Sequence, residues 1–266
     1  MIDNVEVKSL FHRSRERIKS IGEVFTPEVY VNGMLNLLSQ GENISWDDED
    51  IIFFEPACGH GNIVVSIYTK RIEAFYQKAL KEKIPKPAFY AVANAINTLW
   101  AIDTDSENIL ECRTRVLIVS INFLKKTVYL KEQALIKDNQ DFICHLLCAI
   151  TWQIYENETI SALSNKGNAY VNACKTQIGR EWYLKNKHLP LSFESTWASC
   201  FRKKIEKGRI PKIYQQAKKF VGTMFQTSRT VPDYFEFANF LIIKNDTKSN
   251  YYRNSCELVE EKKCIL

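Results

Sequence analysis

The chain has 266 residues, 45% of them hydrophobic, and its 36 lysines and arginines against 31 acidic residues give a formal net charge of +5. This composition is ordinary for a globular protein, and no apolar run approaches the roughly 18 residues that a membrane helix needs, so we expect no membrane partner. The eight cysteines form no Cys-x-x-Cys pair and the first residues do not resemble a signal peptide, so the sequence predicts no metal site and free thiols in the cytoplasm.

Residues 3–20 combine charged and apolar positions, and we expect a leading helix there. One face of this helix would be basic, with Arg13, Arg15, Arg17 and Lys19. Such a face is more often solvated than bound to nucleic acid, and both interpretations stay open.

The segment Gly22-Glu-Val-Phe-Thr-Pro27 is predicted to be a loop that leads into an amphipathic helix. Thr26 is a natural N-cap, and Pro27 suits a first helical turn because proline has no amide hydrogen to leave unpaired there. A capped helix start accounts for both residues. Because a glycine-rich turn follows in the sequence, we favour a second role for them, in contact with a ligand.

That turn belongs to the stretch Ile51-Ile-Phe-Phe-Glu-Pro-Ala-Cys-Gly-His-Gly-Asn62. Four apolar residues at its start are typical of a buried strand, and a helical pattern begins at Asn62. Strand, glycine turn and helix open the nucleotide-binding α/β folds, since glycine lets the backbone approach a ligand whose polar groups the free helix amides can bind. An ordinary tight turn is the alternative.

A second strand is predicted for Leu99-Trp-Ala-Ile-Asp-Thr-Asp105, after a helix that the prolines of Ile84-Pro-Lys-Pro87 terminate. Asp103 would end this strand, where a carboxylate beside a glycine loop can accept hydrogen bonds from two ribose hydroxyls. A solvated strand end is the alternative. Asp105 fits the N-cap of the next helix.

These three blocks, in this order, resemble the first motifs of the S-adenosylmethionine-dependent DNA adenine-N6 methyltransferases of restriction–modification systems. In that family the Phe-Thr-Pro block packs over the methionine end of the cofactor, the Pro-Ala-Cys-Gly block forms the cofactor loop, and the acidic residue ending the second strand binds the ribose. The resemblance covers residues 20–121. It implies S-adenosyl-L-methionine as the cofactor, bound by Phe25, Thr26, Pro27, Glu55, Pro56, Ala57, Cys58, Gly59, Gly61, Asn62 and Asp103.

The resemblance also implies an α/β fold with a Rossmann-like class I methyltransferase core and a largely helical C-terminal part. We expect an N-terminal helix over residues 1–20, the core over 21–150, and a mainly helical region over 151–266 with possible nucleic-acid or partner contacts. DNA is the expected partner, and a partner subunit is possible.

The catalytic block of that family is not recognisable in the sequence. It reads Asn/Asp/Ser-Pro-Pro followed by an aromatic residue, and it supplies acceptors for the target amino group and a ring that stacks the flipped adenine. The chain has no Pro-Pro pair, and Val231-Pro-Asp-Tyr234 and Leu189-Pro-Leu-Ser192 lack the required order. Catalytic residues stay unassigned. Two functions remain open: methyl transfer to adenine in DNA, and a catalytically inactive relative that binds cofactor or DNA or regulates a partner.

The rest of the chain gives weaker signals. Gln140–Ile150 fits either a third strand or a buried helix, and the acidic residue that follows the family's third strand would fall near His145 or Leu146, where none stands. Residues from Thr151 to about Phe225 read as mainly helical, and Tyr234–Ile243 reads as a late strand.

A run of basic residues lies within the helical part of the sequence. A solvated helix face is its commoner meaning, and a phosphate-contacting surface, with Trp197 and Phe201 near enough to stack on bases, is the sharper one. The candidate nucleic-acid residues are Arg202, Lys203, Lys204, Lys207 and Arg209.

Overall fold

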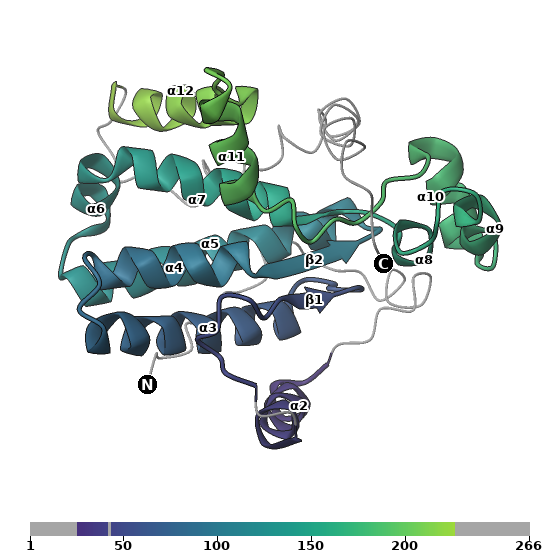
Figure 1. The fold of residues 1–266 in the computed structure, drawn as a ribbon, viewed down its shortest axis with the longest axis horizontal. Coiled ribbons are helices and arrows are strands. Elements are labelled where there is room, and N and C mark those ends of the chain that lie inside the picture. The colour runs from purple at the N-terminus through teal and green to yellow at the C-terminus, as the bar shows by residue number, and fades with distance from the viewer. Residues whose placement is uncertain (1–25, 42–43, 227–266) are drawn as a thin grey trace.

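The computed structural model of the chain describes residues 26–41 and 44–226 (Figure 1). The helix expected over 3–20, the candidate cofactor residue Phe25 and the late strand expected over 234–243 lie outside the described residues. The same holds for Val231–Tyr234, one of the two near matches to the missing catalytic block.

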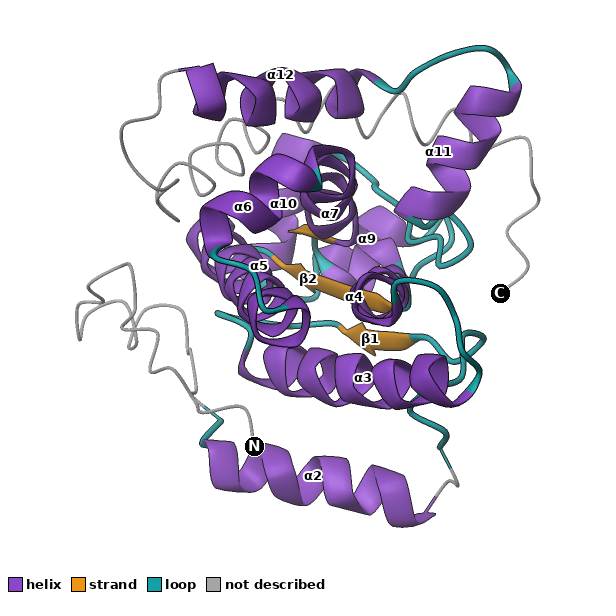
Figure 2. Ribbon diagram, turned by 90° about the vertical axis from the view of Figure 1, so that its left-hand side faces the viewer, coloured by secondary structure: helices purple, strands orange, loops and turns teal. Residues whose placement is uncertain are grey.

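A three-stranded parallel sheet lies at the centre of the described residues, in the order β1-β2-β3. The strands are β1 (Phe53–Glu55), β2 (Leu99–Asp103) and β3 (Ile154–Glu156). Between β1 and β2 the chain forms α3 (Asn62–Lys81) and α4 (Pro87–Asn97), and between β2 and β3 it forms α5 (Ser106–Val128), α6 (Glu132–Asp138) and α7 (Gln140–Gln153). In Figure 2 the sheet lies between α3 and α7.

The expectation of a Rossmann-like core is wrong. The described residues are 66% helical, and their sheet of three short strands is smaller than such a core requires. Part of the reason is that the segment Gln140–Ile150, which the sequence allows to be either a strand or a helix, forms the helix α7. Its side chains from Ile143 to Gln153 are buried with the single exception of His145. A helix buried on all sides has no polar face, so its sequence pattern resembles that of a buried strand.

Several local predictions are confirmed. β1 and β2 form where the apolar runs predict them, and α3 begins at Asn62 and ends at Lys81, before the Pro85–Pro87 break. The side chain of Asp105 caps α5 by accepting from the backbone N–H groups of Glu107 and Asn108. In contrast, Ile154 and Tyr155, read as helical from the sequence, form β3.

The remaining helices surround this centre. α2 (Glu28–Gly41) packs on α3, and α11 (Trp197–Glu206) and α12 (Lys212–Gln226) pack on α7. Three short helices lie beyond the carboxyl ends of the strands (Figure 1): α8 (Thr159–Ala162), α9 (Ala169–Ala173) and α10 (Gln177–Asn186). β3 lies beyond residue 150, where the core was expected to end, and the division into domains stays a prediction.

Two completely buried arginines connect helices to the strands. Arg71 of α3 donates to the carbonyl oxygen of Ile51, before β1, and to the hydroxyl of Thr98, before β2. Arg113 of α5 donates to the carbonyl oxygen of Ile154 in β3. Each buried cation donates to backbone or hydroxyl acceptors beside or within the strands, and so helps to hold the short strands in place.

Candidate functional site

The glycine loop is the turn from Pro56 to Gly61 that joins β1 to α3. It is held against the second strand, because the backbone N–H of Cys58 donates to the carbonyl oxygen of Ile102 over 2.9 Å. Gly59 and Gly61 have φ values of 49° and 94°, in the left-handed region that glycine enters without strain. A Cβ atom built on Gly59 would meet no described atom within 4 Å, so a ligand could approach the backbone there.

The three strands end alike, each with two apolar residues followed by a carboxylate. Asp103 and Glu156 are partners in the parallel pairing of β2 with β3, and Glu55 of β1 pairs with Ala101 of β2. The carboxyl ends of parallel strands lie at one edge of a sheet, which is where ligands bind in open α/β sheets. We call the edge formed by Glu55, Asp103 and Glu156 the acidic edge.

Sequence reasoning missed Glu156. The sequence predicts a possible third strand only over Gln140–Ile150, and the acidic residue expected after it would fall near His145, where none stands. The signal that could have found Glu156 is the repeated strand ending: Phe53-Phe54-Glu55, Ala101-Ile102-Asp103 and Ile154-Tyr155-Glu156 share the order apolar, apolar, acidic.

The Asp103 carboxylate faces the glycine loop. Its Oδ2 accepts from the backbone N–H of Gly59 over 2.9 Å, and its Oδ1 accepts from the backbone N–H of Asp105 over 2.8 Å. Desolvation raises the pKa of Asp103, and these backbone hydrogen bonds oppose the rise. The side chain of Asn108 also makes a hydrogen bond with Asp103. A carboxylate has about four acceptor positions, so Asp103 keeps acceptor capacity for a hydroxyl donor of a ligand.

Glu55 lies at the same edge, with its Oε1 accepting from the backbone N–H of Ala57 over 3.3 Å. Burial raises the pKa of Glu55, the hydrogen bond from Ala57 lowers it, and the negative charge of Asp103 raises it further. A cation or a hydroxyl donor placed between Glu55 and Asp103 would relieve this repulsion. The acidic edge therefore favours a ligand with hydroxyl groups or positive charge.

The structure brings the Thr26–Pro27 block to the glycine loop. The side-chain amide of Asn62 donates to the carbonyl oxygen of Thr26 over 3.1 Å, and its Oδ1 accepts from Nη1 of Arg115 over 2.8 Å. α2 begins at Glu28, and its first backbone hydrogen bonds go to Pro27 rather than to Thr26. Thr26 therefore contacts the loop through its backbone, next to the first residue of α3.

Three further candidate residues of the loop, Pro56, Ala57 and Cys58, differ in burial and in their contacts. Cys58 is buried, and a hydrogen bond with the Cys112 thiol, followed by burial, raises the pKa of its thiol. Its side chain thus packs against α5 and does not face a ligand. Ala57 is exposed, and the carbonyl oxygen of Pro56 accepts a hydrogen bond from the hydroxyl of Thr159.

Gly61→Ala is expected to lower the free energy of unfolding by about 2–4 kcal/mol. The new methyl group would lie 2.6 Å from Sγ of Cys112, and alanine is strained at a φ of 94°. Chemical denaturation measures the loss. Gly167→Ala is the matched control, since no described atom lies within 4 Å of its Cβ position, and should change stability by less than about 0.5 kcal/mol. Equal stability of the two variants would contradict this account of the loop.

The basic run lies on a different part of the molecule. Arg202, Lys203 and Lys204 are on α11, Lys207 is its C-cap, and Arg209 follows. Lys204 is partly buried and the other four are exposed, and α11 packs on α7 rather than at the acidic edge.

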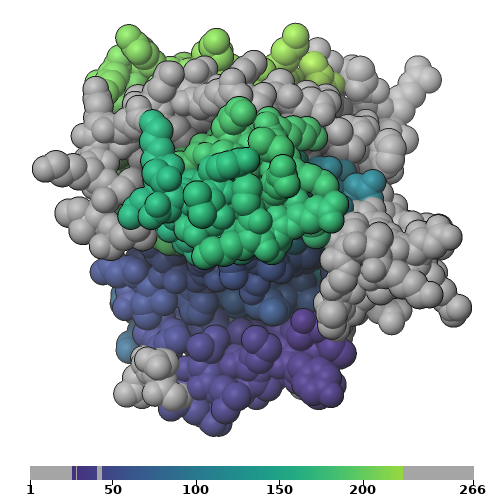
Figure 3. Space-filling view, turned by 90° about the vertical axis from the view of Figure 1, so that its right-hand side faces the viewer, coloured from purple at the N-terminus to yellow at the C-terminus, as the bar shows by residue number. Residues whose placement is uncertain are grey.

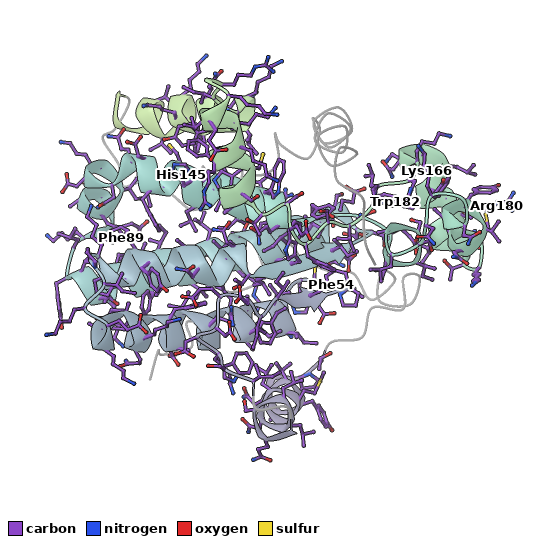
Figure 4. The ribbon with its side chains drawn as sticks, in the orientation of Figure 1. Phe54, Phe89, His145, Lys166, Arg180 and Trp182 are labelled. Atoms are coloured by element: carbon purple, nitrogen blue, oxygen red, sulfur yellow. The ribbon has the colours of Figure 1, made fainter. Side chains whose placement is uncertain are left out.

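The aromatic residues near the basic run pack against His145 of α7. Trp197 is 2% exposed, and its Nε1 donates to Nδ1 of His145, a residue of α7 labelled in Figure 4. The Phe201 ring lies 4.5 Å from the His145 ring, edge to face. Trp197 therefore cannot stack on a base as the sequence suggested. Contact between the five basic residues and nucleic acid stays a prediction.

Among the described residues, no group of three or more His, Cys, Asp or Glu side chains could hold a metal ion. Nor does that part of the chain contain a helix that is both long and apolar enough to cross a membrane.

Comparison with protein-family models, with curated proteins and with solved structures gave no match. A functional proposal for this chain therefore depends on its own residues and their geometry.

Proposed function

We propose that this chain binds S-adenosyl-L-methionine at the acidic edge and is a methyltransferase that resembles the DNA adenine-N6 methyltransferases. The observation that carries the proposal is the Asp103 carboxylate, which ends β2 and accepts a hydrogen bond from Gly59 of the glycine loop. A carboxylate in this position suits the two adjacent hydroxyls of a ribose.

The charge of the edge supports this cofactor over a dinucleotide. Three carboxylates end the three strands, and each would repel a pyrophosphate group. S-adenosyl-L-methionine has no phosphate, and its ammonium and sulfonium groups are cationic. Residues of the described chain thus fit the cofactor: Asp103 would hold the ribose, and Glu55 could accept from an amino or hydroxyl group.

The chemistry supplied by this cofactor, when bound, is an electrophilic methyl group on sulfur. The chain's own part would be to orient the cofactor through the glycine loop and Asp103. The Thr26–Pro27 block would contribute at the same place, since Asn62 connects it to the loop. The group that accepts a hydrogen bond from the target base stays unassigned.

One sequence feature favours a second function. Since the chain has no Pro-Pro pair, it lacks the recognisable catalytic block of the family, and a catalytically inactive cofactor-binding or regulatory protein would have this combination. A partner subunit that completes the active site would reconcile the missing block with catalysis.

Transfer of labelled methyl groups from S-adenosyl-L-methionine to unmethylated DNA tests the proposal, with and without candidate partner proteins. We expect incorporation by the wild-type chain and none above background by Asp103→Ala. Cofactor binding in calorimetry without any transfer would favour the inactive alternative. No cofactor binding by the folded wild-type chain would contradict the methyltransferase and the cofactor-binding form of the alternative.

A further inference from the structure

A small helical lobe, residues 159–188 with α8, α9 and α10, stands beyond the carboxyl ends of the strands (Figure 1), and its teal to green surface faces the viewer in Figure 3. Its first residue, Thr159, donates its hydroxyl to the carbonyl oxygen of Pro56 in the glycine loop. Where the chain returns from the lobe, the carbonyl oxygen of Leu189 accepts from the side-chain amide of Asn157 over 2.9 Å. Both ends of the lobe are therefore attached next to the acidic edge.

The lobe has a strongly one-sided charge. Glu181 is the single acidic residue between 159 and 188, against five basic residues that are all exposed: Lys166, Lys175, Arg180, Lys185 and Lys187. Lys166 and Arg180 are labelled on the lobe in Figure 4. Within the described part of the chain, Lys175, Arg180 and Lys187 have no carboxylate partner. Their charges are thus available to a polyanion.

An exposed aromatic ring accompanies these charges. Tyr170 of α9 is 44% exposed, and its ring lies 5.4 Å from that of Tyr183 on α10. Trp182, by contrast, is 7% exposed and lies in the interior of the lobe. An accessible, supported ring among basic side chains is the usual combination on nucleic-acid surfaces, because phosphates meet the cations and bases stack on the ring.

The lobe and the acidic edge have opposite charge although they touch. A polyanion that approaches the carboxyl ends of the strands would be repelled by Glu55, Asp103 and Glu156 and attracted by the lobe. The basic residues of α11 do not have this placement, because α11 packs on α7. Of these two basic surfaces of the described residues, the lobe is the one adjacent to the candidate cofactor site.

We propose that the lobe binds the phosphate backbone of DNA and so holds the DNA beside the acidic edge. The role of that edge as a cofactor site rests on the proposed function above, whereas DNA binding by the lobe does not. Lys175, Arg180 and Lys187 would contact phosphates, and Tyr170 would stack on an unpaired base.

The test compares two triple variants that each remove three positive charges. One is Lys175→Gln/Arg180→Gln/Lys187→Gln in the lobe, and its matched control is Lys81→Gln/Lys83→Gln/Lys86→Gln, three exposed lysines at the end of α3 that is far from the glycine loop. Fluorescence anisotropy with a labelled DNA duplex, at several salt concentrations, gives the affinity and its salt dependence. The lobe variant should flatten the log–log salt slope by roughly two to three units and weaken binding at 0.1 M salt on the order of 100-fold. The control variant should leave both close to the wild-type values.

Several outcomes would overturn the inference. These are an unchanged salt slope in the lobe variant, an equal flattening by the control variant, and wild-type binding to anionic lipid vesicles without binding to DNA. Calorimetry with S-adenosyl-L-methionine separates the two proposals, because none of the three lobe side chains lies in the acidic edge and cofactor affinity should not change. A wild-type chain that binds DNA through the lobe but binds no cofactor would support this inference and contradict the proposed function.

Discussion

Replacing Asp103 by alanine is expected to weaken the binding of S-adenosyl-L-methionine on the order of 30- to 1000-fold. The carboxylate would accept hydrogen bonds from both ribose hydroxyls, and two such charge-assisted bonds contribute roughly 2–4 kcal/mol. Asp103 is partly buried at the end of β2, and the backbone N–H groups of Gly59 and Asp105 orient its two oxygens. Calorimetry on folded protein measures the loss.

A matched control is Asp50→Asn, which removes a negative charge from an exposed residue before β1, away from the carboxyl ends of the strands. Its affinity for the cofactor should stay within about twofold of the wild type. Comparable losses in the two variants would mean that net charge, and not the position of Asp103, determines binding.

The pH dependence of binding gives a second readout for Asp103. Desolvation raises its pKa above the ordinary value of 3.8, and only the ionised carboxylate can accept from both hydroxyls. Affinity should therefore fall as the pH is lowered through this raised pKa, before an ordinary aspartate would be protonated. Asp103→Asn should lack this component. A wild-type affinity that stays constant from pH 7 to pH 4 would contradict the assignment.

The parts of the fold that could be predicted have strong local signals. Clustered prolines and glycines favour the ends of elements, so β1, the glycine loop and the limits of α3 follow from Pro56, Gly59, Gly61 and Pro85. Asp105 lies before a helical pattern and caps α5, because its side chain reaches the free amides of the next turn. None of these features depends on distant residues.

The parts that could not be predicted depend on tertiary contacts. β3 has three residues, Ile154–Glu156, and is a strand because β2 pairs with it, which so short a run does not specify by itself. For the same reason Glu156 was missed, although it lies directly beside Asp103. The side chains of motif residues also point in different directions. Cys58 belongs to the loop motif, but its thiol points inward and makes a hydrogen bond with Cys112. A motif predicts where the backbone runs better than it predicts which side chains face a ligand.

Arg113→Met is expected to lower the free energy of unfolding by about 3–5 kcal/mol, because two hydrogen bonds from a charged donor, each of about 1.5–3 kcal/mol, would be lost. Nε of Arg113 donates to the carbonyl oxygen of Ile154 over 2.6 Å, and Nη2 donates to that of Thr151 over 2.9 Å. Thr151 and Ile154 are both buried, so water cannot replace the missing donor. Urea denaturation followed by circular dichroism measures the change.

The matched control is Arg115→Met on the same helix, two residues later. Arg115 also makes hydrogen bonds, to the carbonyl oxygen of His60 and the side chain of Asn62, but it is partly exposed. Water can take over the acceptors that it leaves, so its loss should cost less than about 1.5 kcal/mol. The comparison separates burial from the number of hydrogen bonds. If Arg115→Met destabilised the protein as much as Arg113→Met, burial would not explain the effect of Arg113 on the free energy of unfolding. The claim that Arg113 holds β3 in the sheet would then fail.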